Sequence, residues 1–551
     1  MVLTIDDKRV ETAANERIID AIRTAGMDTD CMRARPLAAQ MGGEVFNLGY
    51  IPRQDSDVTL LRYEDAEGMA VYERTLLFVF IAAVRKLFPD ARVYVRYSMG
   101  VGLYIMLSRE PEITEEDVSM IHSECRRIVD ADVCLVRKRL SINDALAFFK
   151  KDGQHDKVDL LKWRRFSYFD VYMMDGYMDY FYGEMAPSTG YVRVFDVQYL
   201  DGAVLLLMPD TENPSLPSRY EPRPKLAQVY AQSDSWGRLM SCACAVDLNR
   251  RVENGSIHEL IRVNEALHER AYAHIADEIA SRKARAVMLA GPSSSGKTTS
   301  ANRIATQLRV LGLDPIMLSL DDYYIDRDKI PADETGAKDL EHINTLDTER
   351  FNADLVSLLA GRETLVPEFD FMTGRRAPEG RLMKLHGDQP LIIEGIHGLN
   401  PSLIAHDIDP DDVYRIYVSA LTTLNLDDHN RIKTTDVRLL RRLVRDYRTR
   451  NAPMELTLSM WQSVRRGEER WIFPYQENAD IIFNTTLHYE LCVLRKHVYP
   501  LLQMVPQESR YYCMSRRIVK FLNYFTDADV EAEIPPTSVL REFIGGNVFY
   551  D

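Results

Sequence analysis

One short segment carries the strongest chemical signal in the sequence. It fits the pattern G-x-x-x-x-G-K-[ST] through Gly291, Gly296, Lys297 and Thr298. In this pattern the glycines let the backbone curl, so that its N–H groups point at phosphate oxygens. The lysine supplies a charge for the β- and γ-phosphates, and the threonine hydroxyl is placed to ligate Mg²⁺. The predicted ATP-binding residues of this loop are Gly291, Ser293, Ser294, Ser295, Gly296, Lys297, Thr298 and Thr299.

The surroundings of the motif separate a phosphate-binding loop from a Gly/Ser turn with a chance lysine. An apolar run at 286–290 precedes it and predicts a strand, and residues 299–310 continue as a helix. The new helix adds its positive end to the same spot. This strand–loop–helix context favours phosphate binding.

Two acidic residues at later predicted strand ends complete a set for phosphoryl transfer. Asp321 follows the run 315–320 and Glu394 follows the run 391–393. Ligands of parallel sheets sit beyond the carboxyl ends of the strands, so both carboxylates are expected to face the loop. One can accept the proton of an attacking hydroxyl, and both can hold Mg²⁺ directly or through water. The alternative is a helix-capping role, which we favour for Asp322 but not for Asp321.

A basic run on a predicted helix is the third feature. Arg438, Arg441, Arg442 and Arg445 fall at helical i, i+3, i+4 and i+7 spacing, followed by Arg448 and Arg450. Like charges at this spacing cost helix stability, so anionic ligands such as ATP phosphates would explain them. A solvated basic face is the alternative.

The elements that must position these residues follow from periodicity. From residue 286 onward, short apolar runs at 286–290, 315–320, 391–393, 413–418 and 481–483 alternate with helical patterns, which predicts a parallel sheet covered on both faces. Upstream, helical patterns are expected at 72–88, 115–129 (opened by Thr114) and 253–282, and strands at 92–97 and 103–107. The fold class expected is α/β.

Composition limits the class of protein. The chain has 551 residues, is 46% hydrophobic and carries a formal net charge of −15, which disfavours non-specific binding to nucleic acid or acidic membranes. The first ten residues lack a secretory pattern, and the apolar run 75–84 is too short for a bilayer span and predicts a buried helix. Seven cysteines without a framework suggest reduced thiols and a cytoplasmic location.

At these motifs the sequence resembles the uridine kinase/phosphoribulokinase family of P-loop kinases, over roughly residues 287–504. The ordered motifs are the phosphate loop, Ser319 to Tyr324, Leu340 to His342, Pro367 to Phe371, Glu394 to Ile396, the arginine run, and Pro474 with Ala479 to Ile482. The resemblance implies that Asp321 is the base for a ribose 5′-hydroxyl, assisted by Lys297. It implies Thr298, Asp321 and Glu394 at the metal site. It also implies ATP contacts from Arg441, Arg445 and Arg450, and substrate contacts from Glu341, Phe369 and Arg442.

The departures from this family fall in the expected base pocket. Phe369 stands where such kinases have a tyrosine, Gly374 where they have a histidine, and Ala452 and Met460 where Arg and Gln are frequent. A pocket that loses hydrogen-bonding groups loses discrimination. The resemblance therefore implies intact phosphoryl-transfer machinery and leaves the identity of the base open.

The N-terminal half resembles the N-terminal region of threonyl-tRNA synthetases. Residues 1–62 resemble a β-grasp-like TGS domain, and residues 63–212 resemble the α+β second additional (editing) domain. That domain's four metal-capable positions are occupied by Arg74, Phe78, Phe181 and Met185. These side chains bind zinc poorly, so the resemblance implies a domain without hydrolytic editing. The expected organisation ends with a linker and long helix at 213–285, the kinase-like domain at 286–505 and an extension at 506–551.

The expected function is transfer of phosphate from MgATP to the 5′-hydroxyl of uridine or cytidine. A second hypothesis is a kinase for another acceptor such as a sugar phosphate. The absence of basic residues at Gly374, Ala452 and Met460 argues against it. A third is an RNA-binding regulatory ATPase whose first half captures tRNA, which the net charge disfavours. The resemblance also implies a homo-oligomer, and no membrane partner is expected.

Overall fold

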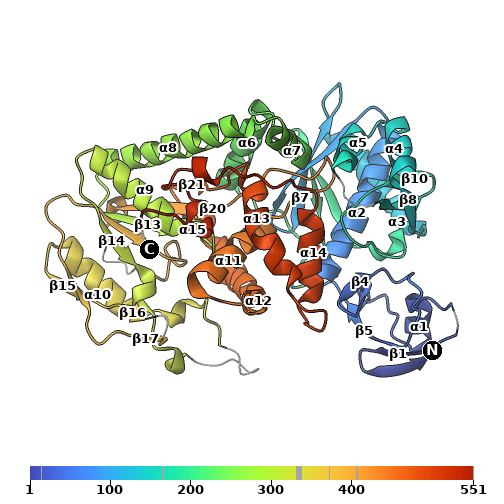
Figure 1. Ribbon diagram of the computed structural model, residues 1–551, viewed down its shortest axis with the longest axis horizontal. Helices are drawn as coiled ribbons and strands as arrows, with labels where there is room; N and C mark the ends of the chain where they lie inside the picture. The colour runs from blue at the N-terminus through green and yellow to red at the C-terminus, as the bar shows by residue number, and fades with distance from the viewer. Residues whose placement is uncertain (14, 164–166, 331–337, 371–372, 405–407, 550–551) are drawn as a thin grey trace.

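The computed structural model describes every residue except 14, 164–166, 331–337, 371–372, 405–407 and 550–551. Its N-terminal part is a small module at one end of the molecule, drawn in dark blue in Figure 1. A five-stranded sheet in the order β2-β1-β5-β3-β4 packs with one helix, which is the β-grasp-like arrangement expected. Strands β1 and β5 are parallel, and the other neighbours are antiparallel. The elements are β1 (Val2–Ile5), β2 (Lys8–Glu11), α1 (Ile18–Thr24), β3 (Ala38–Met41), β4 (Glu44–Phe46) and β5 (Ser56–Leu61).

The second module has two antiparallel sheets, in the orders β11-β12-β7-β6 and β10-β9-β8. The apolar run 75–84 lies in a buried helix, and Thr114 caps the next helix through a capping box with Asp117, as the sequence predicts. The module's elements are α2 (Ala66–Leu87), β6 (Arg92–Met99), β7 (Gly102–Ser108), α3 (Glu115–Asp130), β8 (Val136–Ser141), α4 (Ile142–Lys151), α5 (His155–Lys162), β9 (Tyr168–Met174), β10 (Tyr177–Asp179), η1 (Thr189–Tyr191), β11 (Asp196–Leu200) and β12 (Ala203–Leu207).

Three helices connect this module to the next sheet: α6 (Pro224–Leu239), α7 (Ala245–Glu253) and α8 (Ile257–Arg282). A single helix over 253–282 was expected, and this prediction is wrong at its start. Gly255 adopts φ +77°, in the left-handed region, and so ends α7 before α8 begins. Helix α8 runs along one side of the molecule toward the next strand (Figure 1).

The C-terminal region is built on a five-stranded sheet with all strands parallel, in the order β14-β19-β13-β20-β21. The strands are β13 (Ala286–Ala290), β14 (Ile316–Ser319), β19 (Leu391–Glu394), β20 (Val413–Ser419) and β21 (Ile481–Asn484). All five predicted apolar runs form strands of this sheet. Their carboxyl ends therefore meet at one edge, where the predicted chemical residues follow.

Both faces of the parallel sheet are covered, because alternate residues along each strand point to opposite sides. Along β13, Ala286 and Met288 join one apolar core with α10 (Thr348–Leu359). Val287 and Leu289 join another core with α8 and α9 (Lys297–Val310). The expected α/β class is confirmed for this region.

The remaining elements surround the sheet edge. Short strands and turns follow β14: η2 (Leu320–Tyr323), η3 (Arg327–Lys329), η4 (Ile343–Thr345), β15 (Thr364–Val366), β16 (Phe369–Asp370), β17 (Arg375–Arg376), β18 (Arg381–Met383) and η5 (Pro410–Asp412). The later elements are α11 (Thr434–Arg450), α12 (Met454–Trp471), η6 (Phe473–Asn478), α13 (Glu490–Gln503), α14 (Tyr512–Leu522), η7 (Glu531–Glu533) and α15 (Arg541–Ile544).

One apolar core crosses the boundaries between these parts. It contains Phe149 of α4, Leu443 of α11 and Phe521 of α14. Helix α14 also contacts the second module through polar groups. The Tyr182 hydroxyl donates to the Arg517 carbonyl, and the Arg517 side chain pairs with Glu67 at 3.0 Å. Residues 506–551, whose role the sequence did not indicate, therefore bind both halves together.

A loop at residues 424–431, here called the connecting loop, leads from β20 to α11 and enters the second module. Two hydrogen bonds join the loop to Val95. The Val95 N–H donates to the Asp428 carbonyl at 2.9 Å, and the Asn425 side-chain amide donates to the Val95 carbonyl at 2.7 Å. Lys157 of α5 lies beside Asp427 of this loop and is fully buried. Its Nζ is 3.4 Å from carboxylate oxygens of both Asp179 and Asp427. Burial alone opposes the charge, but the surrounding carboxylates raise the pKa of Lys157 above its ordinary value. The connecting loop therefore meets the second module at a buried cluster of charges, in which Lys157 compensates the surrounding carboxylates.

Across the described ranges, we find no helix that combines the length and apolar character needed to span a bilayer.

Candidate active site

The phosphate loop lies between β13 and α9, at the carboxyl edge of the sheet. Two glycines are required by its packing. A Cβ on Gly291 would stand 2.0 Å from the Val418 carbonyl oxygen, and Gly296 adopts φ +86°. Lys297, whose Nζ is 3.3 Å from the Pro292 carbonyl oxygen, starts the helix. The buried hydroxyls of Ser294 and Ser295 have no hydrogen-bond partner within the described chain. The loop is therefore formed, with polar groups left to bind a ligand.

Helix α11, which carries the arginine run, supports this loop through buried hydrogen bonds. Arg438 donates to the Ser293 carbonyl at 2.9 Å, and Arg441 donates to the Thr485 carbonyl at 2.9 Å and pairs with Glu490 at 2.7 Å. Both guanidiniums are at most 1% exposed. A solvated basic face is therefore wrong for these two arginines. Arg441, expected as an ATP contact, is enclosed and supports the loop instead.

Three other arginines of the run gather around one acid. Asp446, only 3% exposed, lies 3.2 Å from Arg442, 2.9 Å from Arg445 and 3.4 Å from Arg450. Arg442 also donates to the Ser293 hydroxyl at 2.9 Å. Three guanidiniums sharing one carboxylate leave a surplus of positive charge beside the loop, which suits an arriving phosphate.

The predicted carboxylates lie on the other side of the loop. The Thr298 hydroxyl is 3.5 Å from Glu394 Oε1, and the Ser319 hydroxyl lies at the same distance from that oxygen. Burial and the nearby Asp321 raise the pKa of Glu394 to about 7. Burial also raises the pKa of Asp321, while Lys297 and two arginines oppose the rise. These carboxylates are thus electrostatically coupled to each other and to the loop lysine.

A cavity of about 130 Å³ opens beside Asp321. Glu341 and Phe369, both expected to bind substrate, line it, and the ring of Tyr324 lies 5.7 Å from that of Phe369. Burial, and secondarily Glu468, raises the pKa of Glu341 to about 7. A Cβ on Gly467 would stand 2.3 Å from the Glu341 Cβ, so that glycine makes room for the longer acid. The remaining lining residues are Ile325, Arg327, Ile330 and Leu340.

Arg327 was missed by the sequence reasoning. A Cβ on Gly374 would stand 2.6 Å from Arg327 Cδ, so the arginine stem occupies the space that a side chain at 374 would need. Among the described residues, its guanidinium makes no ion pair or hydrogen bond. Met460 is 39% exposed, and Phe371 of the predicted motif lies outside the described residues. The cavity thus contains a cation that the residues at 374, 452 and 460 did not indicate.

The residues at this edge fit Mg²⁺ with a nucleoside triphosphate. Thr298, Glu394 and Asp321 supply only oxygen atoms, the donor type that Mg²⁺ prefers. Within the described residues, no three His, Cys, Asp or Glu side chains converge closely enough to hold a metal alone.

Glu468 of α12 was also missed. It is fully buried, pairs with Arg438 and accepts the Ser293 N–H at 3.1 Å. The sequence did hold a signal for it. Leu458, Trp461 and Val464 share its helix face, so an acid there stands on the apolar side of the helix. An acid at such a position needs a buried partner, and the arginine run offers one.

The four metal-capable positions of the second module do converge, but as packed side chains. Phe78 and Met185 are fully buried and Phe181 is 3% exposed, with the two phenylalanine rings 5.9 Å apart. Arg74 donates to the Glu184 carbonyl at 2.8 Å. Apolar side chains therefore fill the position where the resemblance implied a lost metal.

The parallel sheet, the phosphate loop and the carboxylates at its edge define the C-terminal region as a P-loop kinase. Residues 286–490 match the model of the Phosphoribulokinase / Uridine kinase family, which confirms the resemblance for this region. A solved structure described as a possible uridine kinase from Bacillus stearothermophilus aligns with 36% of this chain and 89% of its own, at 19% identity and a TM-score of 0.25.

Part of the chain is similar to threonine–tRNA ligases. The Clostridioides difficile ligase is 28% identical over 189 residues, which are 34% of this chain. The Syntrophomonas wolfei ligase is 29% identical over 168 residues, which are 30% of this chain. The chain spans 30% and 26% of the length of these two ligases. The resemblance of the N-terminal part to these synthetases is confirmed.

Proposed function

We propose that this protein transfers the γ-phosphoryl group of MgATP to the 5′-hydroxyl of a pyrimidine ribonucleoside, with uridine first among the candidates. The observation that carries the proposal is the pair of carboxylates, Asp321 and Glu341, lining one cavity beside the phosphate loop. Asp321 is suited to act as the general base, and Glu341 is suited to accept hydrogen bonds from the remaining ribose hydroxyls. Tyr324 and Phe369 supply flat apolar walls for a base.

The chain's own residues divide the work of this reaction. The loop N–H groups and Lys297 bind the donor phosphates and stabilise charge on the transferring group. Asp321 accepts the proton of the acceptor hydroxyl as it attacks. The arginines around Asp446 add positive charge near the same phosphates. Thr298 and Glu394 would hold Mg²⁺, and the ion would supply positive charge that offsets the charge of the donor phosphates.

A second acceptor class is favoured by Arg327. Arg327 lines the acceptor cavity, and its guanidinium makes no ion pair or hydrogen bond with the described residues. Arginine binds phosphate and carboxylate in a two-point geometry. An acceptor with an anionic group, such as a sugar phosphate, would supply that partner.

An acceptor panel decides between the two classes. We expect uridine or cytidine to stimulate ADP release from MgATP, and Arg327→Ala to change the acceptor KM less than threefold. If a sugar phosphate is the substrate, Arg327→Ala raises its KM by about tenfold or more, the effect of losing one charge-assisted contact. Arg375→Ala is the matched control, since Arg375 lies on β17 and pairs with Asp328 outside the cavity. No stimulation by any nucleoside or sugar phosphate would contradict the proposed function.

The role of Glu341 predicts a pH dependence. Its pKa is raised to about 7, so the carboxylate is mostly ionised at pH 8 and mostly protonated at pH 6. If the ionised form binds the acceptor, the acceptor KM rises about tenfold as pH falls from 8 to 6. The groups facing Glu341 are Glu468, Arg442, Lys297 and Asp321.

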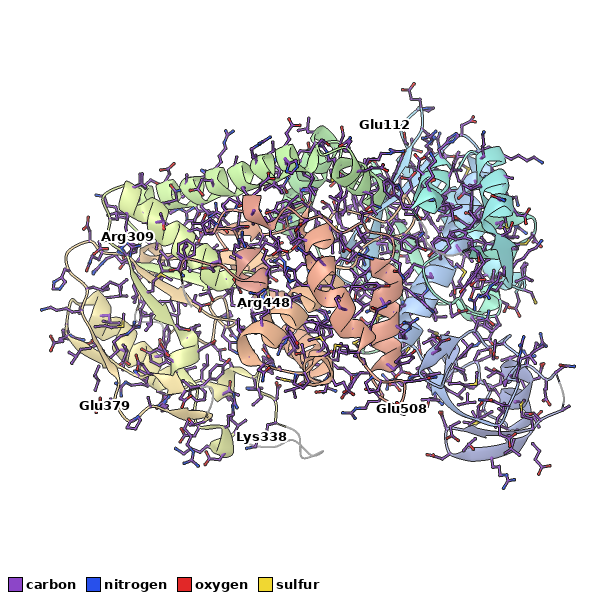
Figure 2. All side chains as sticks on the ribbon, viewed as in Figure 1. Glu112, Arg309, Lys338, Glu379, Arg448 and Glu508 are labelled. Carbon is purple, nitrogen blue, oxygen red and sulfur yellow. The ribbon has the colours of Figure 1, made fainter. Side chains whose placement is uncertain are left out.

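Steady-state KM values at several pH values test this. Glu341→Gln is expected to have a high acceptor KM that no longer follows pH. Glu379→Gln, an exposed residue at the periphery in Figure 2, should retain the wild-type profile. A pH-dependent KM that persists in Glu341→Gln would assign the titration to another group.

A further inference from the structure

The segment 535–546, here called the C-terminal cap, lies against the phosphate loop. It follows η7 and contains the short helix α15. Val539, Leu540, Phe543 and Ile544 are at most 2% exposed. The Ser538 hydroxyl donates to Glu265 of α8 at 2.6 Å, which fixes the start of the cap. The cap is therefore a packed part of the structure (Figure 1).

Apolar residues of the cap cover the loop. The Val539 Cγ1 lies 2.6 Å from where a Cβ on Gly296 would stand, so the cap closes onto the loop's second glycine. Phe543 packs under the Arg441 guanidinium, 5.1 Å from the ring centroid. Gly545 lies against the guanidinium of Arg448 (labelled in Figure 2), which belongs to the last turn of α11. The cap thus contacts both the loop and the helix that supports it.

One residue of the cap, Glu542, is an acid that lies at the start of α9, where the helix dipole favours negative charge. Glu542 Oε2 accepts the Thr299 hydroxyl proton at 2.8 Å. Thr299 is fully buried in the first turn of α9. The N–H groups of that turn have no partner within the helix, and the helix dipole favours a negative charge there. When no donor nucleotide is bound, the Glu542 carboxylate supplies this negative charge.

The negative charge of Glu542 also acts on Glu394, which lies on the opposite side of the site. Burial is the main cause of the raised pKa of Glu394, Asp321 adds to it, and the Glu542 carboxylate makes a smaller contribution. A bound triphosphate would add several negative charges beside Glu542. The repulsion between them would favour withdrawal of the Glu542 side chain.

We propose that the C-terminal cap is part of the donor-nucleotide site, and that Glu542 competes with a donor phosphate for Thr299 and the start of α9. Nucleotide binding then breaks the Glu542–Thr299 hydrogen bond and loosens the cap. Glu542 in this way sets the affinity for the donor. This inference rests on the proposed use of a nucleoside triphosphate, but not on the identity of the acceptor.

Binding of MgADP to the full chain, measured by isothermal titration calorimetry without acceptor, tests the proposal. Glu542→Gln keeps the size and an acceptor oxygen but removes the charge. We expect it to bind MgADP about 2- to 5-fold more tightly than the wild type, the range expected for a charge at a helix N-terminus. Glu533→Gln is the matched control, because Glu533 pairs with His258 away from the loop and should leave the dissociation constant unchanged.

Hydrogen exchange of the wild-type chain gives a second measurement that needs no variant. MgADP is expected to speed exchange of amides in the cap while slowing exchange in the loop. MgADP binding by Glu542→Gln that is equal to or weaker than that of the wild type would overturn the proposal. Slower amide exchange in the cap on MgADP binding would overturn it as well. Tighter binding by Glu542→Gln without any active acceptor would support the cap inference and contradict the acceptor assignment alone. If neither protein binds MgADP, both the inference and the proposed function fail.

Discussion

Replacing Asp321 with asparagine is expected to lower the turnover number by about 100- to 10,000-fold, the usual contribution of a positioned general base. The carboxylate lines the acceptor cavity and is coupled electrostatically to Lys297 and Glu394. Burial raises its pKa, which makes it a stronger base toward a hydroxyl proton than an exposed aspartate. The amide of asparagine keeps the shape and removes the basicity. Acceptor-dependent ADP release measures the change.

Its neighbour is the matched control. Asp322 accepts the Phe369 N–H at 3.4 Å and is absent from the residues lining the cavity. Asp322→Asn should therefore retain turnover within about tenfold, since it only weakens one hydrogen bond to the backbone. Equal losses in the two variants would show that neither carboxylate acts as the base.

Replacing Lys157 with methionine is expected to destabilise the protein by about 3–5 kcal/mol, because it leaves buried carboxylates without their cation. Asp179 and Asp427 are both buried and lie 3.4 Å from the lysine nitrogen. Asp427 belongs to the connecting loop, so the loss also weakens the link between the second module and the kinase region. The midpoint of thermal unfolding, followed by circular dichroism, measures the effect.

Lys162→Met on the same helix separates this effect from a general loss of charge. Lys162 is exposed and pairs with Asp159 at 2.6 Å. A surface pair of this kind contributes less than about 1 kcal/mol, so its removal should barely move the midpoint. A Lys157→Met protein as stable as the Lys162→Met protein would mean that the buried cluster is not essential to the fold.

The elements that could be predicted are those encoded locally. The strands around Gly291 were visible as apolar runs, and their order in the chain placed Asp321 and Glu394 at one edge of a parallel sheet. Thr114 was recognisable as a helix cap because its hydroxyl acts on a residue three positions away. For these features the physical cause lies within a few residues of the effect.

What escaped prediction depends on contacts distant in sequence. Glu542 meets Thr299 across 243 residues, and Arg327 occupies the space left by Gly374. The arginine run was read as a set of phosphate ligands. Arg438 and Arg441 instead pair with Glu468 and Glu490. No local pattern specifies which acid a buried arginine will meet, so the division between supporting and ligand-facing arginines required the fold.

The packing of α14 onto the second module has a consequence for how the chain acquires its structure. The Tyr180 and Tyr524 hydroxyls pair across 344 residues, and Tyr182 meets Arg517 across 335. Contacts of such separation close only after a large loss of chain entropy, which slows folding. The second module emerges early during synthesis, yet its apolar surface stays uncovered until α14 has been made. We therefore expect nascent chains of this protein to be prone to aggregation until the kinase region has been translated.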